Sequence, residues 1–129
     1  MNPQLASIEI NKNDSNLSEP QPSNMSFEKL LLEAVDEVFL LLGDLSHEAV
    51  YLHLVEVFGI KKHEIPYKIE EFVKAIEKIF GPGAKILQIQ IFKHIYKKVG
   101  RGFKYHPKNG DLELTDYLAA LRQFFCSQY

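Results

Sequence analysis

Four segments of this chain combine a helical spacing of apolar residues with a glycine directly after the last apolar turn. The segments, each with the glycine that follows it, are 26–42 with Gly43, 46–58 with Gly59, 67–80 with Gly81, and 83–99 with Gly100. Apolar residues three and four apart line one side of an α-helix, and glycine is favoured after a helix because it adopts the left-handed conformation at low cost. The pattern predicts four successive helices.

The fourth of these segments, 83–99, has apolar residues over more than half of its circumference. Only Gln90, Lys93 and Lys97 define a clear polar strip on it. Helices that are apolar nearly all round are buried, so we expect this helix to run through the middle of a bundle. The broad apolar faces of the first and fourth helices also favour a homodimer.

After Gly100 the apolar spacing changes from a helical period to a period of two. Residues 103–108 and 111–114 alternate in this way, and Asn109-Gly110 between them is typical of a type I′ turn. We therefore predict a β-hairpin, followed by a last helix over 116–127 that Thr115 caps. The predicted fold class is mainly α: a five-helix bundle with one β-hairpin between helices four and five.

The first 25 residues differ in composition from the rest of the chain. They are rich in Asn, Ser, Pro and Gln, with one short apolar patch at residues 5–10. Such a segment cannot bury enough apolar surface to offset the entropy of ordering it. We therefore expect a flexible leader over 1–25 and one helical interaction domain over 26–129.

The cysteine content and the length of the apolar runs indicate a compartment. Cys126 is the single cysteine of the 129 residues, so it has no partner for an intramolecular disulfide, as is usual in a reducing compartment. No apolar run approaches the roughly 20 residues of a membrane-spanning helix. We expect a cytoplasmic protein without a membrane partner.

Charge is strongly segregated along the chain although the total is close to neutral. Residues 1–80 contain fourteen acidic and seven basic residues, whereas residues 81–110 contain seven basic residues and no acidic one. A segregated field orients a partner and speeds its encounter. The basic segment is therefore the predicted partner-binding surface, and its candidate residues are Lys93, Lys97, Lys98, Arg101, Lys104 and Lys108.

No pattern of residues favours catalysis or metal binding. His47 and His53 lie six apart, which does not match the i, i+4 spacing of two zinc ligands on one helix. Cys126 has no neighbour in the sequence that would activate its thiol, and no carboxylate pair has an apolar setting that would tune it for acid–base chemistry. We therefore expect no catalytic residue, no metal, no cofactor and no enzymatic activity.

Nucleic-acid binding is the alternative to docking on a protein. The order of four helices, a basic hairpin and a last helix resembles winged-helix DNA-binding domains, which would place Lys85 and Gln88 of the fourth helix in the major groove. Lys104 and Lys108 would then contact phosphates from the wing. However, the first half of the fourth helix has few base-reading side chains, and the acidic first part of the chain would repel a duplex. We therefore favour a protein partner.

Four motifs between Ser46 and Gly100 also resemble a known family. They read AVYLHL, FGIKKHEIP, FVKAIEKIFGPGAKIL and IYKKVG, and the stretch from Ser46 to Gly100 that contains them covers about half of the chain. On these motifs the stretch is similar to the archaeal Nitrosopumilus output domain. The resemblance implies an archaeal, cytoplasmic module at the effector end of a signal-transduction chain, and it supplies no catalytic residues. We therefore expect a non-enzymatic signalling output or adaptor domain that docks on a protein through its basic surface.

Overall fold

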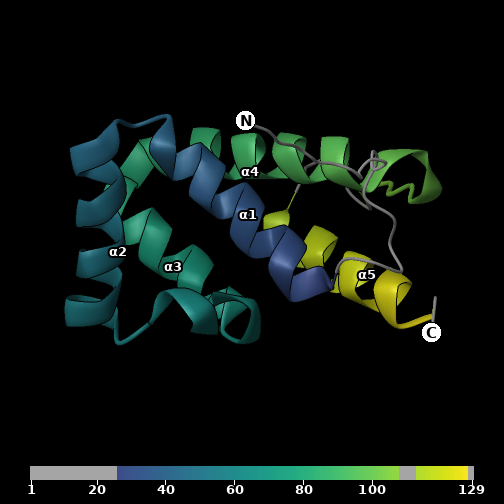
Figure 1. The fold of residues 1–129 in the computed structure, drawn as a ribbon, viewed down its shortest axis with the longest axis horizontal. Helices are drawn as coiled ribbons and strands as arrows, with labels where there is room; N and C mark the ends of the chain where they lie inside the picture. The colour runs from purple at the N-terminus through teal and green to yellow at the C-terminus, as the bar shows by residue number, and fades with distance from the viewer. Residues whose placement is uncertain (1–25, 108–112, 128–129) are drawn as a thin grey trace, which may run out of the picture.

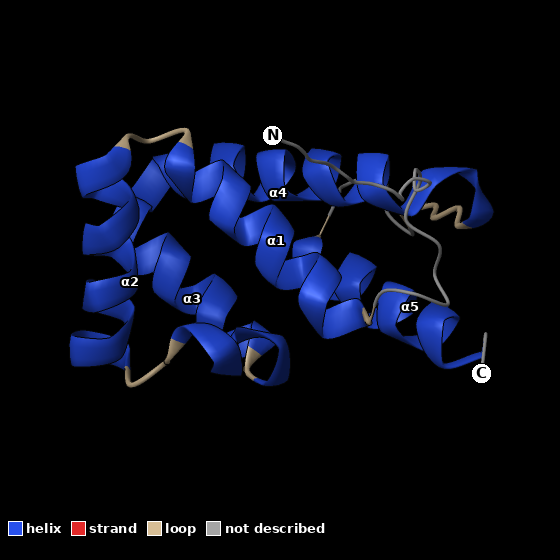
Figure 2. Cartoon of the chain, viewed as in Figure 1, coloured by secondary structure: helices blue, strands red, loops and turns tan. Residues whose placement is uncertain are grey.

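The computed structural model describes residues 26–107 and 113–127, and this part of the chain is helical without any strand (Figure 2). The five α-helices are α1 (Phe27–Leu40), α2 (Asp44–Phe58), α3 (Ile69–Phe80), α4 (Ala84–Val99) and α5 (Leu114–Ser127). Three short 3-10 helices connect them: η4 (Lys62–Tyr67), η5 (Gly81–Gly83) and η6 (Gly100–Gly102). The prediction of a mainly α-helical chain is confirmed.

Helix α1 is the central element of the fold. It begins after Ser26, whose side-chain oxygen accepts a hydrogen bond of 3.0 Å from the backbone N–H of Lys29 and so caps the helix. In Figure 1 it runs diagonally between α4 and α5, and it packs against α2, α4, α5 and η4. Its buried residues are Phe27, Leu30, Leu31, Ala34, Val35, Val38 and Phe39.

A single hydrophobic core surrounds α1. Helices α3, α4 and α5 each contribute apolar side chains to this core, as do Ile60, which precedes η4, and Ile65 within η4. The largest buried side chain is Tyr117 of α5, whose ring meets those of Phe92, Phe103 and Tyr105 at centroid distances of 4.7, 5.7 and 5.4 Å. Burial of side chains of this size contributes roughly 1.5–3 kcal/mol each, so this core supplies most of the stability.

Helix α2 stands at one end of the molecule and contributes little to the core (Figure 1). Only Val50 and Leu54 among its residues are buried. Its C-terminus is closed by Gly59, which is left-handed with φ 69°, and the next residue, Ile60, donates a hydrogen bond of 2.9 Å to the carbonyl of Leu54. This turn buries Ile60 and so fixes where the helix ends.

The starts of three helices differ from the sequence prediction. Helix α2 begins at Asp44, so Ser46 lies in its first turn instead of capping it. Tyr67, expected to begin the third helix, is instead the last residue of η4, and α3 begins at Ile69. Helix α5 begins at Leu114, so Thr115 lies inside it and does not cap it, and α1 ends at Leu40, two residues before the predicted end. The four glycines expected to end helices all have positive φ: Gly43, Gly59, Gly81 and Gly100.

The predicted β-hairpin is wrong. Residues 103–107 form no strand, and Leu114, expected to end the second strand, is the first residue of α5. The alternation is real, but its apolar side packs on a helix: Phe103 lies 5.1 Å from Phe124, and Tyr105 lies 5.4 Å from Tyr117, between ring centroids. This packing replaces the cross-strand pairing. The predicted turn at 109–110 and the leader over 1–25 lie outside the described residues.

Candidate interaction surfaces

One side of α4 faces solvent, contrary to the expectation that this helix runs through the middle of the bundle. Its five residues, which we call the α4 face, are Ile86, Ile89, Lys93, Tyr96 and Lys97. Ile86 and Tyr96 are 65% and 56% exposed, and Ile89 is half-buried. The opposite side, with Ile91 and Ile95, is buried in the core. The α4 face is therefore a mixed basic and apolar surface.

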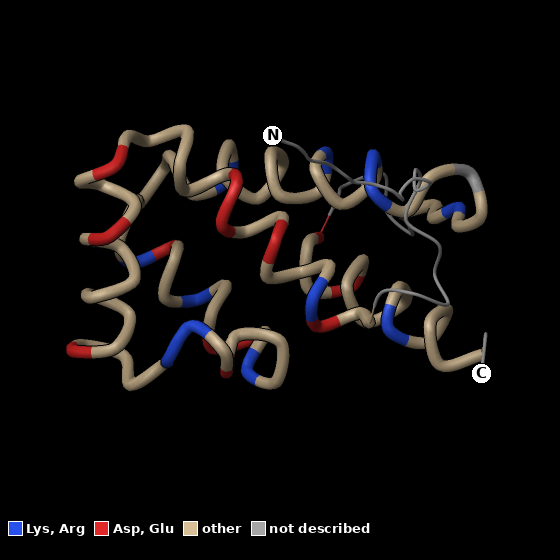
Figure 3. Tube along the Cα trace, in the orientation of Figure 1, with Lys and Arg blue, Asp and Glu red and all other residues tan. Residues whose placement is uncertain are grey.

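The charge of α4 has one sign. The helix contains four lysines and no acidic residue, and Figure 3 shows basic positions along it without an acidic one. Lys93 and Lys97 are exposed, as is Lys104 in the extended segment after η6. Within the described residues none of these three forms an ion pair. Their ammonium groups are therefore available to an acidic partner.

Lys98 was predicted as part of this surface, but it points towards α1. Its Nζ lies 2.8 Å from a carboxylate oxygen of Glu37 and 3.5 Å from one of Glu33. Burial alone would lower the pKa of Lys98, but the two carboxylates outweigh it and raise that pKa above its ordinary value. Lys98 is therefore a bridge between α4 and α1.

The remaining predicted residues do not add to the α4 face. Gln88, a candidate DNA contact, is only 8% exposed, so its amide is turned into the protein. Lys85 is exposed in the first turn of α4. The side chain of Arg101 and all of Lys108 lie outside the described part of the chain. Of the predicted basic residues, the structure thus brings Lys93 and Lys97 together on one side of one helix.

Sequence reasoning missed a second surface, on the outer side of α2. Among the described residues ten large apolar side chains are exposed, and seven of them lie between residues 40 and 57. The residues that point outward from α2, which we call the α2 face, are Leu45, Glu48, Ala49, Leu52, Val55 and Glu56. Leu45 is 88% exposed and Leu52 is 57% exposed. A contiguous exposed apolar surface marks an interaction site.

The α2 face is acidic as well as apolar. Helix α2 contains Asp44, Glu48 and Glu56 and no lysine or arginine, and Figure 3 shows only acidic charged positions along it. The signal that could have revealed this face is the distribution of apolar residues around the helix. Val50 and Leu54 occupy one side and Leu45 and Leu52 the other, and in the structure only the side with Val50 and Leu54 is buried in the core.

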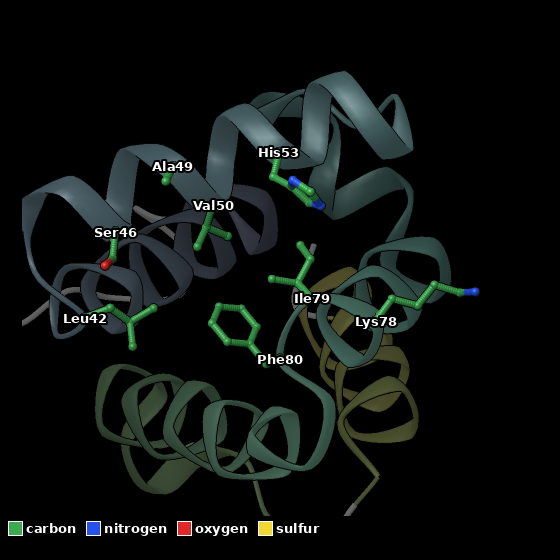
Figure 4. Close-up of a pocket in the computed structure, with 8 residues that line it drawn as sticks. All are labelled: Leu42, Ser46, Ala49, Val50, His53, Lys78, Ile79 and Phe80. Atoms are coloured by element: carbon green, nitrogen blue, oxygen red, sulfur yellow. The ribbon is translucent and has the colours of Figure 1, made fainter.

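A groove runs along the edge of the α2 face, between α2 and the end of α3. It has a volume of about 480 Å³ and is open to solvent. Its lining residues, drawn in Figure 4, are Leu42, Ser46, Ala49, Val50, His53, Lys78, Ile79 and Phe80. The ammonium group of Lys78 points away from the groove, so most of the lining is apolar (Figure 4). Ala49 belongs to both the groove and the α2 face.

Polar contacts through Asp36 of α1 hold α2 in place. Its carboxylate oxygen lies 2.7 Å from Nε2 of His47, and it accepts hydrogen bonds of 3.1 Å from the hydroxyl of Tyr51 and 3.0 Å from Nζ of Lys62. Burial favours a higher pKa for Asp36, but these three partners outweigh it and lower that pKa. The cluster joins α1, α2 and η4.

Helix α1 has a second such cluster one residue further on. The carboxylate of Glu37 forms the ion pair with Nζ of Lys98 described above, and its other oxygen lies 3.0 Å from Nδ1 of His94. Burial favours a higher pKa for Glu37 too, but hydrogen bonds from Lys98 and His94 lower it. Both clusters therefore join α1 to neighbouring helices through ion pairs and hydrogen bonds.

The described residues contain no group of three or more His, Cys, Asp or Glu side chains that could hold a metal ion, and the thiol of Cys126 is exposed. None of the described helices is long and apolar enough to cross a membrane. Comparison with protein-family models, with curated proteins and with solved structures gives no match. The resemblance to the archaeal output domain therefore stays a prediction.

Proposed function

We propose that this chain is a non-enzymatic docking module, of the kind that serves as a signalling output or adaptor domain, and that it binds an acidic protein surface through the α4 face. The observation that carries the proposal is the state of Lys93 and Lys97. Both are exposed, lie one helical turn apart and form no ion pair with a described residue. Ile86 and Tyr96 beside them add apolar area that a partner can bury.

The composition of the α4 face favours a protein partner over DNA. A surface for duplex DNA needs polar side chains that read base edges or a row of phosphate contacts. Here exposed apolar side chains alternate with the lysines, Gln88 is turned inward, and the wing that the DNA-binding alternative required is not formed by 103–107. Aromatic and apolar anchors within a charged rim are typical of protein interfaces.

Titration of a labelled acidic helical peptide, with glutamates and leucines on one side, tests the proposal by fluorescence anisotropy. We expect binding to the whole chain, and a loss of at least tenfold in affinity for the variant Lys93→Glu/Lys97→Glu. The matched control is Lys29→Glu/Lys74→Glu, which changes the net charge equally at two exposed positions on α1 and α3. This control should bind within about twofold of the unmodified protein.

Two results would contradict the proposal. One is equal loss of peptide binding in both double variants, because net charge and not the α4 face would then determine affinity. The other is tighter binding of a labelled DNA duplex than of the peptide, with a steep decrease in affinity as salt rises and with dependence on Lys93 and Lys97.

A further inference from the structure

The α2 face and the α4 face have opposite charge and similar apolar content. On α2, Leu45 and Leu52 share one side of the helix with Glu48 and Glu56; on α4, Ile86 and Tyr96 share one side with Lys93 and Lys97. The two faces share no residue and lie on different helices, so one chain can use both at the same time. From this complementarity we infer that the α2 face of one copy binds the α4 face of a second copy, head to tail.

Charge determines which occupant fits the α2 face. In a symmetric pair of α2 helices the acidic residues of both copies, Glu48 and Glu56, would lie in one interface without a cation from either helix. Like charges brought together oppose association. A fitting occupant must therefore bring cations together with apolar side chains, and the α4 face has both.

The groove beside the α2 face supplies room for the second copy. Ala49 lies between Leu45 and Leu52 and lines the groove, so a helix laid along α2 can approach closely there. A large apolar side chain such as Ile86 or Tyr96 would then enter a groove of about 480 Å³. This insertion would bury apolar surface that each copy alone exposes.

A contact between the α2 face of one copy and the α4 face of another is not symmetric. This asymmetry determines which assemblies can form. Because each copy keeps one unused face after docking, head-to-tail contacts extend into chains or close into rings, and do not stop at a dimer. A standard interface buries roughly 800 Å² per partner and about 20–30 residues a side, whereas each face here has five or six residues. We therefore expect weak association that requires high protein concentration.

This inference rests on the proposed function, because it names the acidic partner of the same α4 face. Its test is sedimentation of the whole chain and two variants at low salt. The first variant, Leu45→Ala/Leu52→Ala, changes only the α2 face and keeps good helix formers. The second variant, Lys93→Glu/Lys97→Glu, changes only the α4 face. A third variant, Glu48→Lys/Glu56→Lys, replaces the first if the alanine substitutions unfold α2.

We expect the average mass of the unmodified protein to rise with concentration beyond that of a dimer or to settle at a ring. Each variant alone should remain monomeric. An equal mixture of the first two variants should form dimers and nothing larger, because only one intact α2 face and one intact α4 face meet. Higher salt should weaken all of these complexes.

Three results would overturn the inference. The first is an unmodified protein that stays monomeric at every concentration. The second is self-association of the α4 variant, which would show a symmetric α2 contact. The third is a mixture of the two variants that stays monomeric. If the protein is monomeric but still binds the acidic peptide through Lys93 and Lys97, this inference is wrong and the proposed function stands; if it binds neither, both are wrong.

Discussion

Helices α1 and α2 are consecutive, nearly equal in length and equal in apolar content, yet the structure uses them differently. They have 14 and 15 residues, with nine apolar residues each. Helix α1 buries seven residues and α2 buries two. The difference lies in the arrangement around the helix: α1 gathers its apolar residues on one broad side, whereas α2 distributes them all round. The number of apolar residues therefore does not show how much a helix contributes to a core.

The contrast separates residues that stabilise the fold from residues available for contact. Leu31 of α1 is 1% exposed, whereas Leu52 of α2 is 57% exposed, although both are leucines within helices. The outer leucines of α2 gain little from folding, because they remain in contact with water. Docking on a second surface would explain their presence, and the predictions below test each side of this contrast.

The largest expected effect comes from truncating matched leucines in the two helices. Leu31→Ala leaves a cavity in the core and should lower the free energy of unfolding by about 2–5 kcal/mol. Leu52→Ala should change it by no more than about 0.5 kcal/mol, because the side chain lies at the surface. Urea unfolding followed by circular dichroism measures both. Equal destabilisation by the two substitutions would show that α2 is as much a part of the core as α1.

The next effect concerns the tie that holds α2 against α1. Asp36→Asn removes the charge that His47, Tyr51 and Lys62 share, and should lower the free energy of unfolding by about 1–2 kcal/mol. Amide exchange should accelerate in α2 more than in α3. The control Glu48→Gln changes an exposed carboxylate of α2 and should leave both quantities nearly unchanged. Uniform acceleration over all helices would contradict a local role for Asp36.

Acid should weaken the same ties. The pKa values of Asp36 and Glu37 are lowered in the folded protein, so at pH near their ordinary values of about 4 the unfolded chain binds more protons than the folded one. Their contribution to stability is complete above that pH and is lost as the pH falls through the lowered pKa values. Urea unfolding at pH 7, 4 and 3 measures the loss. The Asp36→Asn variant should show a shallower decrease; a decrease as steep as that of the unmodified protein would exclude Asp36 as a source.

The smallest effect distinguishes two adjacent lysines of α4. Lys98→Met removes the ion pairs with Glu33 and Glu37 and should cost about 1 kcal/mol of stability, the upper end for a partly exposed pair. Lys97→Met should be nearly neutral for stability but should weaken binding of the acidic peptide. Thermal unfolding and anisotropy measure the two properties separately. Loss of stability with Lys97→Met, together with loss of peptide binding with Lys98→Met, would contradict this assignment of the two lysines.

Much of the helical architecture was predictable from the sequence because its causes are local. The helix ends were predicted nearly correctly because their signals act within one or two turns. These signals are the apolar spacing of 27–40 and 84–99 and the glycines at 59 and 100. The hairpin prediction was wrong because the alternation at 103–107 indicates only that one side of the segment is covered by other residues. It does not reveal whether a strand or, as here, the aromatic side of α5 provides the cover.

The candidate surfaces were only partly predictable for the same reason. The charge of 81–110 pointed to α4, but the sequence did not reveal that Lys98 turns towards the carboxylates of α1 while Lys97 does not. It also did not reveal the α2 face, because a helix that is apolar all round looks buried until its neighbours are known. Both outcomes depend on which helices meet, and that is a property of the whole fold.

Amide hydrogen exchange of the unmodified protein at a low and a high concentration tests most directly whether the apolar outer side of α2 serves as a contact surface. We predict that peptides covering 44–58 and 84–99 exchange more slowly at the high concentration, while those covering 69–80 and 114–127 do not change. The variant Lys93→Glu/Lys97→Glu should lose this concentration dependence. Exchange that is independent of concentration in α2 and α4, or slowing confined to α2, would contradict the head-to-tail contact.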